Sequence, residues 1–308
     1  MENTRAKTTR NSLILLLTAT IWGMAFVSQS KGMDYMHPFT FNGVRSLIGA
    51  AGILVYILIS RKIAGDKATK LDWKLNVRAG LLCGIFLTIA STLQQFGIKY
   101  TSVGKAGFIT TLYIIFVPMF GIFLKKKVAP VVWAAAGMAA VGMYLLCMTE
   151  SLRLGAGDIM VFLCAIAFAI QIMTVDHYAA RIDGAVVSCI QFTVCGVVCC
   201  IGALIWGQPT FGQIQEGLGA LLYAGVLSCG VGYTLQIVGQ KGLNPTVAAL
   251  IMSLESVIAT ISGWIAYKIG FLSTDQTLTP RQIAGCVIVF AAVILVQLPP
   301  EWFRFGKK

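Results

Sequence analysis

Residues 92–123 read TLQQFGIKYTSVGKAGFITTLYIIFVPMFGIF, and a related stretch begins 142 positions later, at residue 234. In this ungapped frame, identical residues recur along the stretch: Thr92-Leu93-Gln94 with Thr234-Leu235-Gln236, Gly97 with Gly239, Lys99 with Lys241, Ala106 with Ala248, Leu112 with Leu254 and Gly121 with Gly263. The same offset aligns Ala25-Phe26 with Ala167-Phe168 and Gln29 with Gln171. One offset that matches two separate regions predicts a tandem duplication.

The bulk composition indicates a membrane protein. Hydrophobic residues make up 57% of the 308 residues and charged residues only 12%, about half the charged share of a typical soluble domain. The net charge of +12 does not indicate a nucleic-acid binder, because the bases lie in short breaks between apolar runs and not on one continuous face. Short basic breaks are typical of the cytoplasmic loops of membrane proteins.

Ten apolar segments have close to the length of about 20 residues that a helix needs to cross a bilayer. Barrel strands need only about 10 alternating residues, so the spans are predicted to be helices. The predicted fold class is therefore an all-α membrane protein with ten transmembrane helices. These helices are 12–30, 39–60, 77–98, 103–124, 128–147, 157–175, 184–206, 217–240, 244–267 and 280–298.

The basic residues between the spans predict the orientation. With the N-terminus inside, 17 bases fall in the inner segments and six in the outer segments. The positive-inside rule then places both termini and the loop 61–78 in the cytoplasm, and the segment 150–158 outside. The predicted location is the plasma or inner membrane of a cell, which the chain crosses many times.

The duplication divides the ten spans into two five-helix repeats, residues 12–149 and 156–298. Five is an odd number, so the second repeat enters the membrane from the opposite side and the two repeats are predicted to be inverted. Inverted repeats with a site at their interface, near the middle of the bilayer, recur in transporters. One chain supplies both halves, so no oligomer is required.

The sequence resembles the EamA-type family of ten-helix transporters in the drug/metabolite transporter superfamily, from about residue 12 to residue 298. The motifs that carry the resemblance are Trp22-Gly23, Pro38 to Arg45, Phe108-Ile109-Thr110 with Phe116-Val117-Pro118, and Leu250 to Glu255. The family pattern often has Pro after the ninth-span Glu and ends that helix with Gly-Glu. This chain has Ser256 and Lys268-Ile269-Gly270 at those places. The resemblance implies secondary transport of small metabolites, often export.

Glu255 is one of two charged residues deep within the predicted spans. It lies eleven residues from Asn244, or about 16 Å along a helix, near the middle of a hydrocarbon core about 30 Å thick. Its counterpart in the first repeat is Tyr113. Two interpretations stay open: Glu255 binds a substrate amine or carries a coupling proton, since charged groups inside membranes are usually functional, or it joins neighbouring helices by hydrogen bonds.

Arg45 is the second deep charge, seven residues beyond Pro38 and so about 10 Å from the outer end of its span. Its planar guanidinium matches a substrate carboxylate. The alternative is a scaffold role, in which Arg45 donates hydrogen bonds to backbone carbonyls or to a neighbouring helix.

Polar side chains at helical spacing mark further candidate cavity residues. Trp22, Phe26 and Gln29 share one helical face, and Phe168 and Gln171 repeat it in the second half. Gln94 on the third span matches Gln236 on the eighth. The candidate substrate-binding residues are Trp22, Gln29, Arg45, Gln94, Tyr113, Gln171, Tyr233, Gln236 and Glu255. The small stripe of Ser253, Ser256 and Thr260 is expected to pack between helices instead.

No cofactor or metal is expected. Most of the nine Cys residues lie within apolar runs, where thiols behave as small apolar side chains. The sequence has no GxxxxGK[ST] motif for an ATP-driven pump.

These patterns predict a secondary active transporter, not an enzyme. Its predicted cargo is a small organic metabolite such as an amino acid or a related compound, which it exports by alternating access, with proton coupling as one option. The alternatives are an integral-membrane enzyme or flippase acting on a lipid-linked carrier, which needs clustered acid–base groups at a membrane face, and a passive channel, which needs a selectivity ring.

Overall fold

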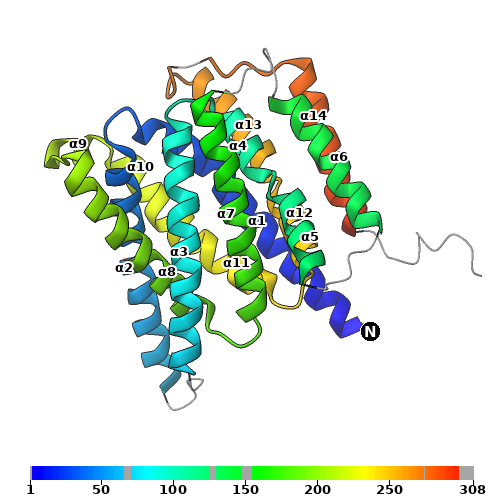
Figure 1. Cartoon of the computed structure of the whole chain (residues 1–308), viewed down its shortest axis with the longest axis horizontal. Coiled ribbons are helices and arrows are strands. Elements are labelled where there is room, and N and C mark those ends of the chain that lie inside the picture. The colour runs from blue at the N-terminus through cyan, green and yellow to red at the C-terminus, as the bar shows by residue number, and fades with distance from the viewer. Residues whose placement is uncertain (1, 66–70, 125–129, 148–154, 274, 298–308) are drawn as a thin grey trace, which may run out of the picture.

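The computed structural model of the chain describes residues 2–65, 71–124, 130–147, 155–273 and 275–297 (Figure 1). Helices form the regular structure of these residues. The elements are α1 (Glu2–Gly32), α2 (Pro38–Ala64), α3 (Trp73–Ile98), α4 (Val103–Thr111), α5 (Tyr113–Phe123), α6 (Pro130–Cys147), α7 (Ala156–Tyr178), α8 (Gly184–Gly202), η2 (Ala203–Gly207), α9 (Phe211–Glu216), α10 (Leu218–Leu222), η3 (Tyr223–Gly232), α11 (Tyr233–Gln240), α12 (Pro245–Met252), α13 (Glu255–Lys268) and α14 (Pro280–Gln297).

Eight helical segments of the described chain are long and apolar enough to cross a membrane, which makes this a multi-pass membrane protein. They are Lys7–Gly32, Pro38–Ala64, Trp73–Ile98, Val103–Phe123, Ala156–Tyr178, Gly184–Gly207, Leu218–Gln240 and Pro245–Lys268. Two shorter apolar helices, Pro130–Gly142 and Pro280–Leu295, lie within the fifth and tenth predicted spans. The all-helical class is therefore confirmed, whereas the number of ten membrane-crossing helices stays a prediction.

The fourth and ninth predicted spans differ from expectation, because each is broken into two shorter helices. The break between α4 and α5 falls at Leu112, whose N–H donates to Ile109 O (3.2 Å), and the break between α12 and α13 falls at 253–254, where Leu254 N–H donates to Ile251 O (3.3 Å). Hydrogen bonds to the third preceding carbonyl tighten the helix locally. Leu112 and Leu254 are the matched positions of the duplicated stretch.

The starts of these two broken spans are also alike. Ser102 caps α4 by accepting from Lys105 N–H, and Asn244 caps α12 by accepting from Thr246 N–H. Ser102 and Asn244 are again 142 positions apart. Such side-chain caps satisfy amide groups that the first helical turn leaves without a backbone partner.

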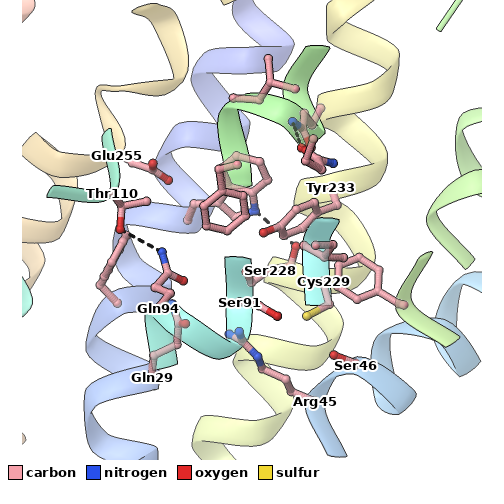
Figure 2. A pocket seen from close by; sticks show the side chains of 18 of the residues that line it. Gln29, Arg45, Ser46, Ser91, Gln94, Thr110, Ser228, Cys229, Tyr233 and Glu255 are labelled. Carbon is pink, nitrogen blue, oxygen red and sulfur yellow. Dashed lines mark hydrogen bonds between the residues drawn. The ribbon is translucent and has the colours of Figure 1, made fainter. Parts of the chain in front are cut away.

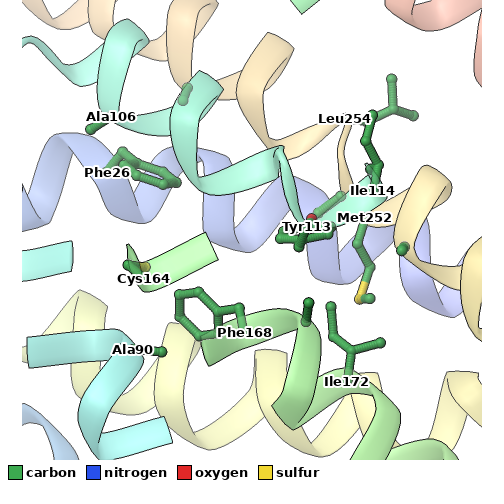
Figure 3. Packing of buried hydrophobic residues seen from close by; sticks show 14 of the residues in the cluster. Phe26, Ala90, Ala106, Tyr113, Ile114, Cys164, Phe168, Ile172, Met252 and Leu254 are labelled. Carbon is green, nitrogen blue, oxygen red and sulfur yellow. The ribbon is translucent and has the colours of Figure 1, made fainter. Parts of the chain in front are cut away.

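The most extensive helix contacts join the N-terminal half of the chain to the C-terminal half. α2 packs against α8, α3 against α7 and α8, and α1 against α13 and α11. α6 and α14 pack against each other at one edge of the bundle (Figure 1). Buried side chains from both halves form one large apolar cluster, in which Phe26, Tyr113 and Phe168 lie among their neighbours (Figure 3).

Part of the predicted topology falls on residues outside the described ranges. These residues are Lys67, Lys70, the three lysines 125–127, Arg153 and the C-terminal bases at 304–308, together with Glu150 of the predicted outer segment.

Candidate functional site

One internal cavity lies between helices of the two halves (Figure 2). All nine residues that the sequence predicts for a binding cavity line it: Trp22, Gln29, Arg45, Gln94, Tyr113, Gln171, Tyr233, Gln236 and Glu255. The volume of the cavity is about 30 Å³. A water molecule needs about 10–15 Å³ on the same scale, so this conformation has room for water but not for a metabolite.

Glu255 and Tyr113, the matched pair of the two repeats, are in direct contact. Tyr113 Oη donates a hydrogen bond to Glu255 Oε1 over 3.0 Å. Each is the first residue of a half-helix, α5 for Tyr113 and α13 for Glu255, and both side chains are buried. Among the described residues no base forms an ion pair with Glu255. The helix breaks therefore bring a carboxyl group and a phenol together at the cavity wall.

Gly23 lets α1 approach α13 closely beside this carboxyl group. A Cβ atom at position 23 would lie 2.7 Å from the backbone oxygen of Glu255 and would also overlap Ile258. Trp22, the residue before Gly23, lines the cavity.

Gly23→Ala is therefore expected to destabilise the protein by about 1–3 kcal/mol, since the added methyl group forces the helices apart. Thermal unfolding of the purified protein measures this loss. Gly52→Ala is the matched control, because Gly52 lies within α2 and a methyl group added there would meet no atom of a neighbouring helix within 4 Å. The control should keep or raise the stability, as Ala favours helix over Gly by about 1 kcal/mol. Equal unfolding temperatures for the two variants would contradict the close approach.

Arg45 on α2 is a buried cation that forms no ion pair with a described carboxylate. The residue is only 5% exposed, and its Nε is fully buried with no hydrogen-bond partner among the described residues. The guanidinium lies 5.4 Å from the ring of Phe41 and lines the cavity beside Ser46 and Ser91 (Figure 2). The hydrogen bonds to backbone carbonyls that a scaffold role predicts are not found in the described part of the chain.

Three of the four cavity glutamines have a buried amide atom without a hydrogen-bond partner among the described residues. Gln94 Nε2 donates to Thr110 Oγ1 (3.1 Å), and Gln236 Nε2 donates to Gln171 Oε1 (3.2 Å). Within the described structure, Gln29 Oε1, Gln171 Nε2 and Gln236 Oε1 are buried without a partner. Because buried polar atoms are nearly always hydrogen-bonded, these atoms are suited to water or to a polar solute.

Aromatic side chains form another wall of the cavity. The rings of Trp22 and Tyr233 lie 4.5 Å apart, and Phe192 meets Tyr233 edge-on at 5.0 Å. Trp22 Nε1 donates to Ser228 O (3.4 Å), a carbonyl of the π-helix η3 that also accepts from Tyr233 N–H. The indole is therefore held in place from the opposite half of the chain.

Sequence reasoning missed several cavity residues. Ser46, Leu87, Ile172, Phe192, Ser228 and Cys229 also line the cavity. Helical spacing from Phe168 could have found Ile172, because the two residues are four positions apart. Ser228 and Cys229 lie in the π-helix η3, whose register departs from that spacing.

The Ser/Thr stripe on the ninth span lies away from the cavity lining. Ser253, Ser256 and Thr260 are buried, and their hydroxyls donate to carbonyls of the same span, at Leu250, Ser253 and Ser256. The hydroxyls are thus satisfied within their own span, and their role in packing between helices stays a prediction.

Comparison with known proteins identifies relatives over nearly the whole chain. The EamA-like transporter family matches residues 10–148 and again residues 155–298. An uncharacterized transporter of Archaeoglobus fulgidus is 27% identical over 92% of this chain and 84% of its own length. The uncharacterized transporter YwfM of Bacillus subtilis is 24% identical over 94% of each chain. A solved crystal structure shares the fold, with a TM-score of 0.74 and 16% identity over 96% of this chain and 99% of that chain. The family match and the names of the curated relatives point to a transporter rather than an enzyme.

Proposed function

Because the chain belongs to the EamA-like transporter family, we propose that it is a secondary active transporter that exports small organic metabolites, such as amino acids or related compounds, by alternating access. The observation that carries the proposal is the central cavity, which Arg45 lines from one half of the chain and Glu255 from the other. A site at the interface of two halves, beside broken helices, is a recurring transporter arrangement.

The two charges of the cavity favour a zwitterionic substrate. A buried charge is costly unless it is paired, and neither Arg45 nor Glu255 forms an ion pair with another described residue. A substrate carboxylate would bind the guanidinium fork of Arg45, and a substrate ammonium group would bind Glu255. The faces of Trp22 and Tyr233 would add cation–π attraction for the ammonium group, and the free amide atoms of Gln29 and Gln171 would bind its polar substituents.

The proposed architecture is ten transmembrane helices in two inverted repeats, residues 12–149 and 156–298. Helix breaks at matched positions, 112 and 254, support this arrangement. The packing is also reciprocal: α3 of the third span packs against α7 of the sixth, and η3 and α11 of the eighth span pack against α1 of the first. A rotation that exchanges the repeats would exchange these two contacts.

The inverted topology predicts that a single cysteine at position 61 labels from the cytoplasmic side and one at position 155 from the outside, in a chain cleared of its own thiols. The positive-inside distribution of bases is the physical reason. Membrane-impermeant maleimide applied to intact cells, and then to opened cells, measures the difference. Labelling of both positions from the same side would rule out the inversion.

Transport would require the cavity to widen, because pockets for drug-sized ligands have volumes of about 300–1,000 Å³. Polar contacts tie the two halves at both ends of the bundle. At the predicted outer end, Lys105 Nζ donates to Asp158 Oδ2 (2.6 Å) and Thr101 Oγ1 to Asp158 Oδ1 (2.9 Å). At the predicted inner end, Asn11 Nδ2 donates to Lys241 O (2.7 Å). Opening of either side would break the contacts at that end.

Lys105→Gln is expected to destabilise the protein by about 1–3 kcal/mol and to raise labelling of a cavity cysteine at Ser91 from the outer side. The physical reason is that Asp158, whose side chain is only 4% exposed, loses its cation while it stays buried. Lys31→Gln is the matched control: Lys31 is as exposed as Lys105, but its partner Asp34 is 57% exposed, so that exposed pair is worth less than about 1 kcal/mol. Equal effects of the two changes on the unfolding temperature and on labelling would contradict an outer closing contact.

Reconstitution in proteoliposomes tests the function itself. Uptake or release of a panel of labelled amino acids, amines and carboxylates is measured with and without a pH gradient. We expect zwitterions to be transported faster than the singly charged analogues. No transport of any zwitterion, by protein whose folding is verified, would overturn the proposed substrate class.

A further inference from the structure

A second groove, distinct from the central cavity, lies at one end of the bundle and has a volume of about 500 Å³. Both halves contribute to its walls. Its lining consists of Tyr56, Ile57, Ser60 and Arg61 of α2, Leu71 and Asp72 just before α3 and Asn76 of α3, and of Ala180 to Ala185, Thr234, Val238 and Lys241 from the other half. We call it the basic groove.

Three cations line the basic groove, and none of them forms an ion pair with a described carboxylate. Arg61 stacks on the ring of Trp73 at 5.8 Å. The other two bind backbone carbonyls: Arg181 donates to His177 O (3.4 Å) and Lys241 to Ile182 O (3.3 Å). The positive charges of these three side chains are therefore available to bind an anion.

The two acids of the groove are occupied as helix caps. Asp72 Oδ1 accepts from Leu75 N–H at the start of α3. Asp183 Oδ1 accepts from two backbone amides at the start of α8. Each carboxylate is thus directed at a helix N-terminus, where a negative charge is favourable. Exposed Lys62, Lys74 and Arg78 on α2 and α3 add further positive charge at this end.

The groove also adjoins an apolar surface. Tyr56 and Ile57 line it, and α2 continues from there with exposed Leu54, Val55, Leu58 and Ile59. On a membrane-spanning helix such a surface faces lipid acyl chains. A positively charged recess beside an acyl-chain surface matches both parts of an anionic phospholipid.

We propose that the basic groove binds the phosphate head group of an anionic phospholipid, whose acyl chains lie along α2. The lipid is not the transported substrate, so this inference goes beyond the proposed function. Its head group would bridge the two halves, because Arg61 belongs to one half and Arg181 and Lys241 to the other. Anionic lipid would therefore stabilise the conformation in which the groove is formed.

Thermal unfolding in lipid–detergent mixtures tests the proposal. The purified protein is compared in phosphatidylcholine alone and in a mixture with roughly one part in four of phosphatidylglycerol, which carries one negative charge. We expect the anionic lipid to raise the unfolding temperature by about 2–4 °C. An Arg61→Gln/Arg181→Gln double variant should lose at least half of this increment, whereas a Lys99→Gln/Lys268→Gln control, whose bases lie at the predicted opposite end, should keep it.

A comparison with glycerol phosphate distinguishes binding of the lipid from binding of a soluble phosphate. If the free anion in water raises the unfolding temperature as much as phosphatidylglycerol does, the acyl chains contribute nothing and the lipid assignment is wrong. Equal unfolding temperatures in the two lipid mixtures would also overturn it. Should the double variant fold poorly, native mass spectrometry of the parent protein decides, since retention of phosphatidylglycerol no greater than that of phosphatidylcholine would contradict the proposal.

Discussion

Replacing Glu255 by Gln is expected to abolish the dependence of transport on a proton gradient while the protein still folds. In the parent protein, Tyr113 Oη donates to Glu255 Oε1 over 3.0 Å. Glutamine keeps the size of the side chain and an oxygen that can accept this hydrogen bond, but it cannot bind or release a proton. Loss of a charged partner for a substrate ammonium group costs about 1.5–3 kcal/mol. We therefore expect transport at a fixed pH to fall at least about tenfold.

Tyr113→Phe is the informative companion variant. It removes the hydroxyl that donates to the carboxyl group and leaves the carboxyl group in place. Transport by this variant should still depend on pH, but with a displaced pH profile. A hydrogen bond favours one protonation state of the Glu255 carboxyl group over the other, so its removal changes the balance between the two states.

Transport by Glu255→Gln with the parent's rate and pH profile would show that Glu255 only joins helices. In that event Glu255→Ala should mainly reduce the yield of folded protein, because Tyr113 Oη would be left buried without its partner. Proteoliposome transport between about pH 5 and pH 8, with thermal unfolding of each variant in parallel, separates the two roles.

Replacing Arg45 by Gln is expected to abolish transport of carboxylate-bearing substrates and to leave the unfolding temperature unchanged or higher. The guanidinium is buried, and its Nε has no described partner, so its removal relieves the desolvation of a charge. A scaffold residue would behave in the opposite way, because its loss would leave backbone carbonyls unsatisfied and lower the stability. Arg45→Lys should also transport poorly, since an ammonium group cannot bind a carboxylate in the two-point fork of arginine.

Substrate analogues sharpen this test. An amino acid and its carboxamide differ only at the group that Arg45 is proposed to bind. For the parent protein we expect the KM of the carboxamide to be at least about tenfold higher, and for Arg45→Gln the two values should be close, because the missing charge no longer distinguishes them. Arg281→Gln is a matched control, since Arg281 contacts an aromatic ring, Tyr144, at 5.3 Å but belongs to α14, away from the cavity lining. If Arg45→Gln lowers transport of the amino acid and of its carboxamide to the same degree, and also lowers the unfolding temperature, the result would support the scaffold role.

The sequence by itself determined the class of this protein. Apolar runs and their lengths are local properties, and a bilayer admits few solutions for the backbone of such runs, so the helical membrane fold could be predicted without a structure. The offset of 142 positions is likewise visible in the printed sequence and pairs Tyr113 with Glu255. Depth along a helix follows from a rise of about 1.5 Å per residue, which is why Arg45 and Glu255 could be selected as candidate site residues.

Only the tertiary structure decided how these residues meet. Nothing in the hydropathy of 103–124 or 244–267 indicates a break at Leu112 or at 253–254, because the change from one hydrogen-bond register to another depends on what packs against the helix. The contact between Tyr113 and Glu255 crosses 142 residues of chain, and the cavity that Arg45 lines is formed by residues of both halves, among them Ser91 and Cys229. Local sequence sets which segments are helical and how deep a side chain lies, whereas a partner, or its absence, is a property of the space between helices and appears only once they are packed.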